Sequence, residues 1–289
     1  MAVHIWSGAT STDVNTAGNW TNGVPVDGGS VIIQGTVSMA GSLTALQGVT
    51  VVDFNVVTDY SGNIGSASAP LLLGACTGTF RYAGKGEYAK IGFTTDGAES
   101  GICASAFLTH TGGTFYAASG TGGVWTSVRN GAGTLYVEAG CVITNLYNGS
   151  GRLDVLYNTT PTVLTLLENG GLAFINRSVT TLKCVQGRTI HRNNGTANYL
   201  LCTTVDVMPG AVYNKQSGGT DVTVNLYSGG TLTFAGSQGS NQTGAGVTIT
   251  TLNEWPGSAI NTASAPGIAV TVTNRNPVGQ GAGGGSPTS

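Results

Sequence analysis

Two carboxylates in the middle of the chain are the residues best placed to do chemistry. Glu138 and Asp154 lie in or beside two short apolar segments that begin at Leu135 and Leu153. If these segments stack on successive turns of a repeat, both side chains point outward and sit diagonally, about 7–8 Å apart. That spacing falls in the range that inverting glycosidases use for a general acid and a water-activating base. The alternative, which we favour, is that both are solvated surface charges and that the protein is not an enzyme.

Other residue types that could do chemistry lack the spacing that it requires. The three histidines, His4, His110 and His191, share no ligand spacing with one another or with carboxylates, so no metal is expected. The sequence has no G-x-S-x-G, H-E-x-x-H or Walker-type loop, and no cofactor is expected. Five widely separated cysteines without a C-x-x-C pair are interpreted as small buried apolar residues, which suits assembly in a reducing cytoplasm.

A further set of side chains could form a contact surface, because an alternating strand pattern places them on the outward face. The set comprises Trp125, Tyr147, Leu164, Leu166 and Tyr227. Tyrosine and tryptophan are enriched in protein interfaces, and they can also stack on sugar rings. Because the two leucines are apolar, we expect an interface between subunits rather than a sugar-binding surface.

The elements that would position these residues come from an internal repeat. Its clearest copies begin at Val124, Val142, Val163 and Val222, and each has apolar residues or threonines at alternate positions followed by Asn-Gly or Ser-Gly. With two looser copies included, the repeat glycines are Gly131, Gly149, Gly170, Gly187, Gly210 and Gly229. Their spacing of roughly 20 residues is typical of a solenoid, in which each unit buries its face by stacking on its neighbours.

The alternation within one copy predicts which side chains point inward. Val124, Thr126 and Val128 are expected inside, with Trp125 and Arg129 outside. The Asn-Gly pair that follows is expected to form a corner, since both residues tolerate the left-handed backbone region that a sharp turn requires. The same dipeptide also suits a two-residue antiparallel hairpin, which remains as the alternative. The expected fold is all-β, a single-stranded parallel β-helix (β-solenoid) with rungs of about 20 residues.

The organisation along the chain follows from this repeat. Residues 1–30, with Trp6-Ser7-Gly8 and Asn19-Trp20, are expected to form an N-terminal cap. Residues 31–275 form the parallel β-helix, and residues 276–289 are a tail rich in Gly and Ser. Such a tail frays in isolation, so we expect an assembly to hold it.

Composition excludes several classes of partner. A net charge of −2 with only 8% charged residues argues against nucleic acid as a partner, because binding to phosphates uses clustered Lys and Arg. No apolar run approaches the length of a membrane span, about 18 residues, and the N-terminus lacks the pattern of an export signal. We therefore expect neither membrane insertion nor export by a signal of its own.

The N-terminal pattern W-x-G followed by N-W-x-x-G-x-P-x-x-G-x-x-V-x-I, with Val- and Thr-rich rungs behind it, resembles two groups of β-helical proteins. One comprises bacterial surface proteins of the autotransporter passenger type, and the other comprises phage virion proteins. The latter include trimeric tailspikes, fibres and capsid-decorating proteins. The likeness covers most of the chain but is one of repeat style.

The resemblance to virion proteins implies a function, which we carry forward as an expectation. It implies a structural protein made in the host cytoplasm and carried on the virion, forming a homotrimer that decorates the outer capsid and contacts the major capsid protein or another virion protein. The first alternative is a tailspike or fibre that binds or cleaves host glycans, which would use Glu138 and Asp154. The second is a bacterial adhesin.

Overall fold

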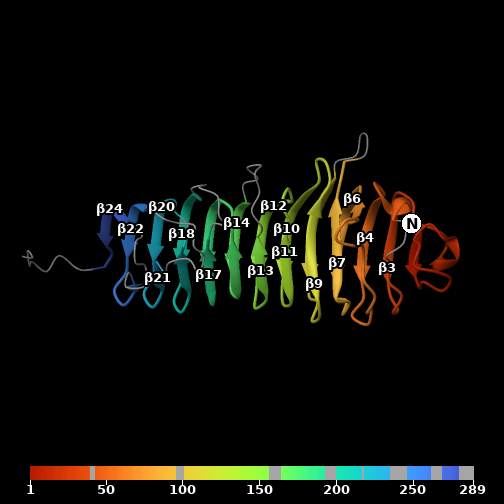
Figure 1. The fold of residues 1–289 in the computed structure, drawn as a ribbon, viewed down its shortest axis with the longest axis horizontal. Helices are drawn as coiled ribbons and strands as arrows, with labels where there is room; N and C mark the ends of the chain where they lie inside the picture. The colour runs from red at the N-terminus through yellow and green to blue at the C-terminus, as the bar shows by residue number, and fades with distance from the viewer. Residues whose placement is uncertain are drawn as a thin grey trace, which may run out of the picture.

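The computed structural model shows an elongated rod of β-strands (Figure 1). It describes residues 1–39, 43–95, 101–155, 164–192, 200–216, 218–234, 246–261 and 269–279. The chain winds through about 10 turns of about 23 residues, and the strands pair in parallel, so the fold is a parallel β-solenoid. Val163 of the repeat and residues 280–289 of the tail lie outside the described residues.

Two long sheets run the length of the rod. In the described part of the chain, sheet A has 14 strands and sheet B has 10, and from β4 onward successive strands alternate between the two sheets. The strands of sheet A are β1 (Val3–Trp6), β2 (Trp20–Thr21), β3 (Gly29–Ile33), β4 (Thr50–Val56), β6 (Ala75–Tyr82), β8 (Ile102–Leu108), β10 (Val124–Asn130), β12 (Val142–Asn148), β14 (Leu164–Asn169), β16 (Val179–Cys184), β18 (Cys202–Val207), β20 (Gly219–Leu226), β22 (Val247–Glu254) and β24 (Val270–Pro277). The strands of sheet B are β5 (Leu71–Leu73), β7 (Tyr88–Phe93), β9 (Thr114–Ser119), β11 (Thr134–Val137), β13 (Arg152–Val155), β15 (Leu172–Ile175), β17 (Arg188–His191), β19 (Val212–Lys215), β21 (Thr231–Thr233) and β23 (Ala259–Asn261).

Pairing between turns settles the choice between a solenoid and hairpins. Val124 of β10 pairs with Val142 of β12, and Thr134 of β11 pairs with Arg152 of β13, both in parallel. The hairpin alternative is therefore wrong. The length of a turn varies along the rod, because the paired residues Cys76 and Cys103 are much farther apart in sequence than Val124 and Val142.

The two ends of the rod differ. At the N-terminal end β1 pairs in parallel with β3 and antiparallel with β2. One 3-10 turn, η1 (Ala17–Asn19), contacts β2, and a second, η2 (Thr44–Leu46), contacts β5. Trp6 and Trp20 pack edge to face with centroids 5.1 Å apart. At the other end β24 is the last strand of sheet A, and Thr271 to Pro277 are all exposed.

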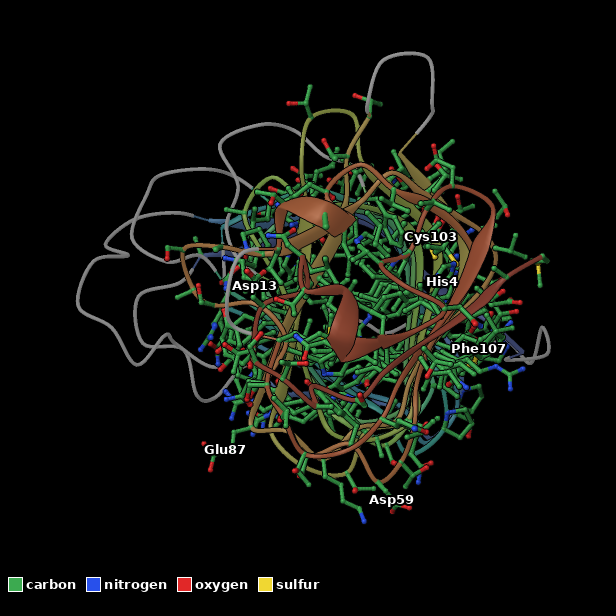
Figure 2. All side chains as sticks on the ribbon, turned by 90° about the vertical axis from the view of Figure 1, so that its right-hand side faces the viewer. His4, Asp13, Asp59, Glu87, Cys103 and Phe107 are labelled. Atoms are coloured by element: carbon green, nitrogen blue, oxygen red, sulfur yellow. The ribbon has the colours of Figure 1, made fainter. Side chains whose placement is uncertain are left out.

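The core fills the space between the sheets (Figure 2), whereas Asp59 and Glu87 project from the rim. The inward positions on sheet A do not follow the strict alternation that the sequence predicted. On β10 the buried residues are Trp125, Val128 and Asn130, so the prediction holds for Val128 but is wrong for Trp125, which is fully buried. Val124 is half-buried and Thr126 is exposed.

The same change of phase occurs on the neighbouring strands. Cys103, Ala106 and Leu108 are buried on β8, and Ile143, Leu146 and Asn148 are buried on β12. Each strand therefore has inward residues three and then two positions apart. The strands stay in register from turn to turn, and the shared irregularity is therefore a bend along sheet A.

The Asn-Gly corners form for a different reason from the one expected. Asn22 is the only non-glycine residue with a positive φ among those described, and Gly131, Gly149 and Gly170 do not adopt the left-handed region. Close stacking explains the glycines, since a Cβ at Gly170 would lie 2.9 Å from the carbonyl oxygen of Gly149. The asparagine side chains point inward and bond to one another along the rod.

Candidate functional site

The two carboxylates suggested by the sequence belong to separate ion-pair groups. The Glu138 carboxylate lies 2.8 Å from the ammonium of Lys90. Asp154, whose side chain is 4% exposed, accepts a 2.7 Å hydrogen bond from Arg152 Nε and lies 3.6 Å from Arg192 Nη2. Each carboxylate is thus neutralised by its own cations, an arrangement that suits structural ion pairs. The acid–base role for Glu138 and Asp154 stays a prediction.

An aromatic surface lies next to these ion pairs on the outer face of sheet B. Tyr88, Tyr116 and Tyr136, which we call the tyrosine strip, come from β7, β9 and β11. Their ring centroids are 4.8 and 5.2 Å apart in sequence order, and all three rings are half-buried. Burial is the main cause that raises the pKa of Tyr88 and Tyr116. Stacked, partly exposed rings flanked by charges form a surface with both apolar and polar character.

Beyond the tyrosine strip, toward the C-terminal end of sheet B, two arginines surround the ring of Phe174. The guanidinium groups of Arg152 and Arg192 lie 4.9 and 4.4 Å from the ring centroid of Phe174. Both arginines also pair with Asp154, so each cation has an aromatic and an anionic neighbour. Sequence reasoning missed this cluster, because it depends on register between turns.

The remaining predicted interface residues are scattered. Tyr147 is half-buried on the outer face of sheet A with the Arg129 guanidinium 4.5 Å from its ring, and Leu166 is half-buried on β14. Tyr227, which directly follows β20, stacks on Trp255 at 4.5 Å. The side chain of Leu164 lies outside the described residues, and Trp125 belongs to the core.

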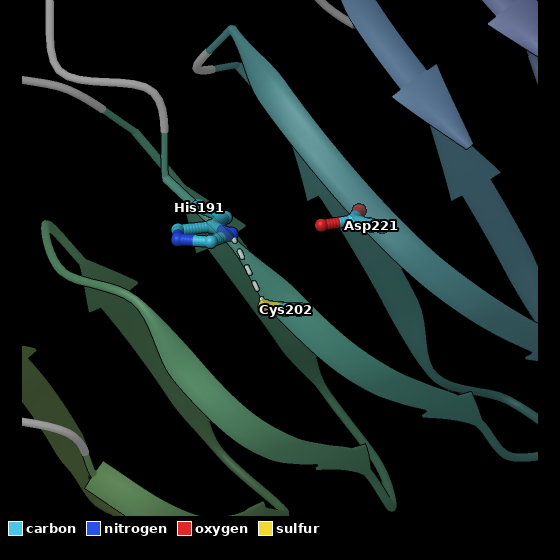
Figure 3. Close-up of side chains that lie close together, drawn as sticks. All are labelled: His191, Cys202 and Asp221. Atoms are coloured by element: carbon cyan, nitrogen blue, oxygen red, sulfur yellow. Dashed lines mark hydrogen bonds between the residues drawn. The ribbon is translucent and has the colours of Figure 1, made fainter. Parts of the chain in front are cut away.

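A second candidate site lies inside the rod between β17 and β20. His191, Cys202, Tyr213, Lys215 and Asp221 form what we call the buried polar cluster, and each is fully buried. Figure 3 shows Asp221 of β20 directed toward His191 and Cys202. In sheet B, His191 and Lys215 continue an inward row that begins with Val155 and Ile175 on the preceding turns. In sheet A, Asp221 continues an inward row that begins with Val179 and Cys202.

Lys215 and Asp221 form the centre of this cluster. Lys215 Nζ donates to Asp221 Oδ1 at 2.8 Å and to the carbonyl oxygen of Leu200 at 3.2 Å. The Tyr213 hydroxyl donates to Asp221 Oδ2 at 3.0 Å. Removing two charges from water costs several kcal/mol per ion, which such bonds must offset.

The hydrogen bonds of His191 fix its protonation state. Its Nε2 lies 2.9 Å from the carbonyl oxygen of Arg177, which can only accept, so Nε2 carries the proton. Its Nδ1 lies 3.2 Å from Lys215 Nζ, which can only donate. Burial, together with the charge of Lys215, lowers the pKa of His191 well below 6.5. His191 is therefore neutral, and its Nδ1 lies within hydrogen-bond distance of both Lys215 Nζ and the Tyr213 hydroxyl, the latter at 3.1 Å.

His191, Cys202 and Asp221 also place potential metal-ligating atoms within 4.8 Å of one another. The ammonium of Lys215 lies within hydrogen-bond distance of two of these residues and supplies the positive charge that a cation would bring. Burial is the main cause that raises the pKa of the Cys202 thiol, which disfavours the thiolate that metals bind. The donor set therefore fits a buried lysine better than a metal ion.

Comparison with family models, curated proteins and solved structures finds no match to this chain. None of the helices in the described part of the chain has the length and apolar character to cross a membrane.

Proposed function

We propose that this chain is a structural, non-enzymatic protein of a phage particle, which forms a homotrimer of parallel β-solenoids on the outer capsid surface. Its partners are then its own copies and the major capsid protein or another virion protein. The observation that carries the proposal is the outer face of sheet A, which presents Phe107, 38% exposed, and on later turns the half-buried Tyr147 and Leu166. Figure 2 places Phe107 at the rim of the rod.

Several features of the rod support a structural role. Register within sheet A places Phe107, Arg129 and Tyr147 at one outward position on three successive turns. Leu166 pairs with Asn145 in the adjacent outward row. A surface of this kind, with apolar and aromatic side chains beside a cation, is suited to burial against another subunit.

The oligomeric state tests the proposal first. We expect light scattering after gel filtration to give three times the monomer mass of 29.0 kDa. The double variant Phe107→Asp with Leu166→Asp should be monomeric, because it buries unpaired charges in the subunit contact. The matched control is Tyr116→Asp on the outer face of sheet B, which should remain trimeric. A monomeric wild-type protein would remove the trimer from the proposal.

The position on the particle tests the rest. Cryo-electron microscopy of a virion that carries this chain should show rods at local threefold positions of the capsid. Density confined to the tail would instead favour the role of a receptor-binding protein.

The tyrosine strip favours a second candidate function, the binding of host surface glycans. Its rings offer faces for sugar rings, and Lys90, Glu138 and Arg152 offer hydrogen-bonding groups alongside. Binding of the trimer to immobilised host polysaccharide, weakened by Tyr116→Ala and unchanged by Tyr147→Ala, would support this function. Equal binding by both variants would exclude the strip.

A further inference from the structure

We propose that Lys215 and Asp221 form an intramolecular amide cross-link, a modification that the chain performs on itself inside the rod. The reacting groups are in contact, since Lys215 Nζ lies 2.8 Å from Asp221 Oδ1. Their side chains are 0% and 1% exposed. Lys215 ends β19 of sheet B and Asp221 lies on β20 of sheet A, so the bond would join the two sheets across the interior.

The pair lies in an interior that excludes water. The core of the rod includes the fully buried Val205, Val224 and Leu232, and the buried polar residue Asn214 directly precedes Lys215 in sequence. A low-dielectric site penalises the ammonium and the carboxylate, whereas a neutral amine and a carboxylic acid cost far less to bury. A proton moving across the 2.8 Å hydrogen bond converts one pair into the other without changing the net charge.

The neighbouring side chains are suited to the steps that follow. The neutral Lys215 amine attacks Cγ of Asp221, which forms a C–N bond and places negative charge on Oδ2. The Tyr213 hydroxyl, 3.0 Å from Oδ2, donates a hydrogen bond to that charge. His191 Nδ1, 3.2 Å from Lys215 Nζ, accepts the second amine proton and returns it to the leaving oxygen.

The reaction is balanced without any other reagent. One C–N bond forms, one C–O bond of Asp221 breaks, and one water molecule leaves. No oxidant, reductant or metal takes part. His191 and Tyr213 end in the states in which they began, because His191 has passed on the proton that it received.

Peptide mass spectrometry of the denatured wild-type protein tests the cross-link. Trypsin cleaves after Arg192, Lys215 and Arg275 in this part of the chain, so an unmodified chain gives separate peptides 193–215 and 216–275. An amide at Lys215 blocks cleavage there, and we expect one peptide, 193–275, lighter by one water than its sequence. Fragmentation of its backbone between Lys215 and Asp221 should release no separate fragments, because these two residues close a ring.

Other mass patterns would overturn the proposal. Complete cleavage after Lys215 without loss of water would mean that the two residues form an ion pair only. Loss of water from peptide 216–275 together with cleavage after Lys215 would mean that Asp221 forms a succinimide instead.

Variants separate the roles of the residues. Asp221→Asn should give the same cross-linked peptide with loss of ammonia in place of water. Lys215→Arg should abolish the linkage, and the matched control Lys183→Arg on β16 should retain it. Tyr213→Phe and His191→Gln should slow the reaction in freshly refolded protein. A linkage formed equally fast in both would exclude these positioning roles, and the wild-type peptide map remains decisive if any variant fails to fold.

Discussion

The side-chain amide of Asn148 accepts a hydrogen bond from Asn130 and donates one, 2.7 Å long, to Asn169, which itself donates to Thr189. The three asparagines end β10, β12 and β14 on successive turns, Thr189 lies on β17 of sheet B, and all four residues are buried. The hydrogen bonds run from Asn130 through Asn148 and Asn169 to Thr189, so the four side chains form a polar seam inside an apolar core. A seam of this type contributes to stability only while every member is present.

We expect Asn148→Ala to lower the free energy of unfolding by about 1–3 kcal/mol, because buried groups of Asn130 and Asn169 lose their partner. Urea denaturation measures the change. The matched control is Asn225→Ala in the outer row, where Asn225 bonds to Asp206 and Asn253 but is only half-buried. A control loss as large as that of Asn148→Ala would contradict the importance of the inner seam.

Trp125 is expected to be among the most sensitive positions of the core. It packs within 4.7–6.2 Å of the rings of Phe80, Phe93 and Phe115, and its indole N–H donates to the carbonyl oxygen of Ala118. Trp125→Ala should cost about 3–5 kcal/mol through the cavity that it leaves. The unfolding midpoint in denaturant measures this loss. Were Trp125 an interface residue, the variant would change oligomeric state and leave monomer stability intact.

Stability should decrease in mild acid because two histidines are buried. Burial lowers the pKa of His110 and His191 below their ordinary value of 6.5. Below pH 6.5 the histidines of the unfolded chain bind protons that those of the native state do not. The contribution of the buried neutral histidines to the free energy of unfolding is therefore complete above pH 6.5 and is lost as the pH falls below that value. Each histidine should account for up to about 1.4 kcal/mol per pH unit in this range.

One variant measures how much of the loss of stability in acid is due to His110. His110→Phe keeps an aromatic ring against Tyr82 and Phe115 but cannot take up a proton. Urea unfolding at pH 7.5 and at pH 5.5 should show a smaller difference for this variant than for the wild type. An unchanged difference would mean that His110 is not buried and neutral.

The five cysteines should be unreactive in the native protein. All are buried, which keeps reagents away from them. Burial also raises the pKa of Cys141 and Cys184 to about 12, whereas a hydrogen bond with Cys103 lowers the pKa of Cys76, whose protection therefore comes from burial alone. Dithionitrobenzoate should modify them only in guanidinium chloride. The exposed position of Thr126→Cys provides a control thiol that should react at once in the folded protein. Rapid reaction of the wild type would show that part of the core opens.

The sequence was sufficient to predict the parallel solenoid because the repeat controls it. Val128, Leu146 and Leu167 recur before an Asn-Gly pair and are all buried, as their spacing indicated. The first half of the repeat strands in sheet A, such as β10 and β12, was predicted in the wrong phase. Val124 and Thr126 fit alternation as well as Trp125 does, and a bend in the strand leaves no mark in residue type.

The same error of phase hid the buried polar cluster. An alternation that places Val222 inward leaves Asp221 on the outside, whereas Val222 is 37% exposed and Asp221 is fully buried. His191, Lys215 and Asp221 lie on three strands, and only the winding of the chain brings them together. Their signal in the sequence is weak, consisting of charged residues at positions that carry Val and Ile on other turns.

The equal offset of the two sheets across one turn in the middle of the rod has a consequence for how the length of this rod can change. Val124 and Val142 are as far apart in sequence as Thr134 and Arg152, so the two sheets advance in step over that turn. Removal of one such unit would bring β8 onto β12 and β9 onto β13 with matching faces. The rod would shorten by one strand spacing, about 4.8 Å. The length of the rod can therefore change by whole turns of this kind while the residues at its two ends stay the same.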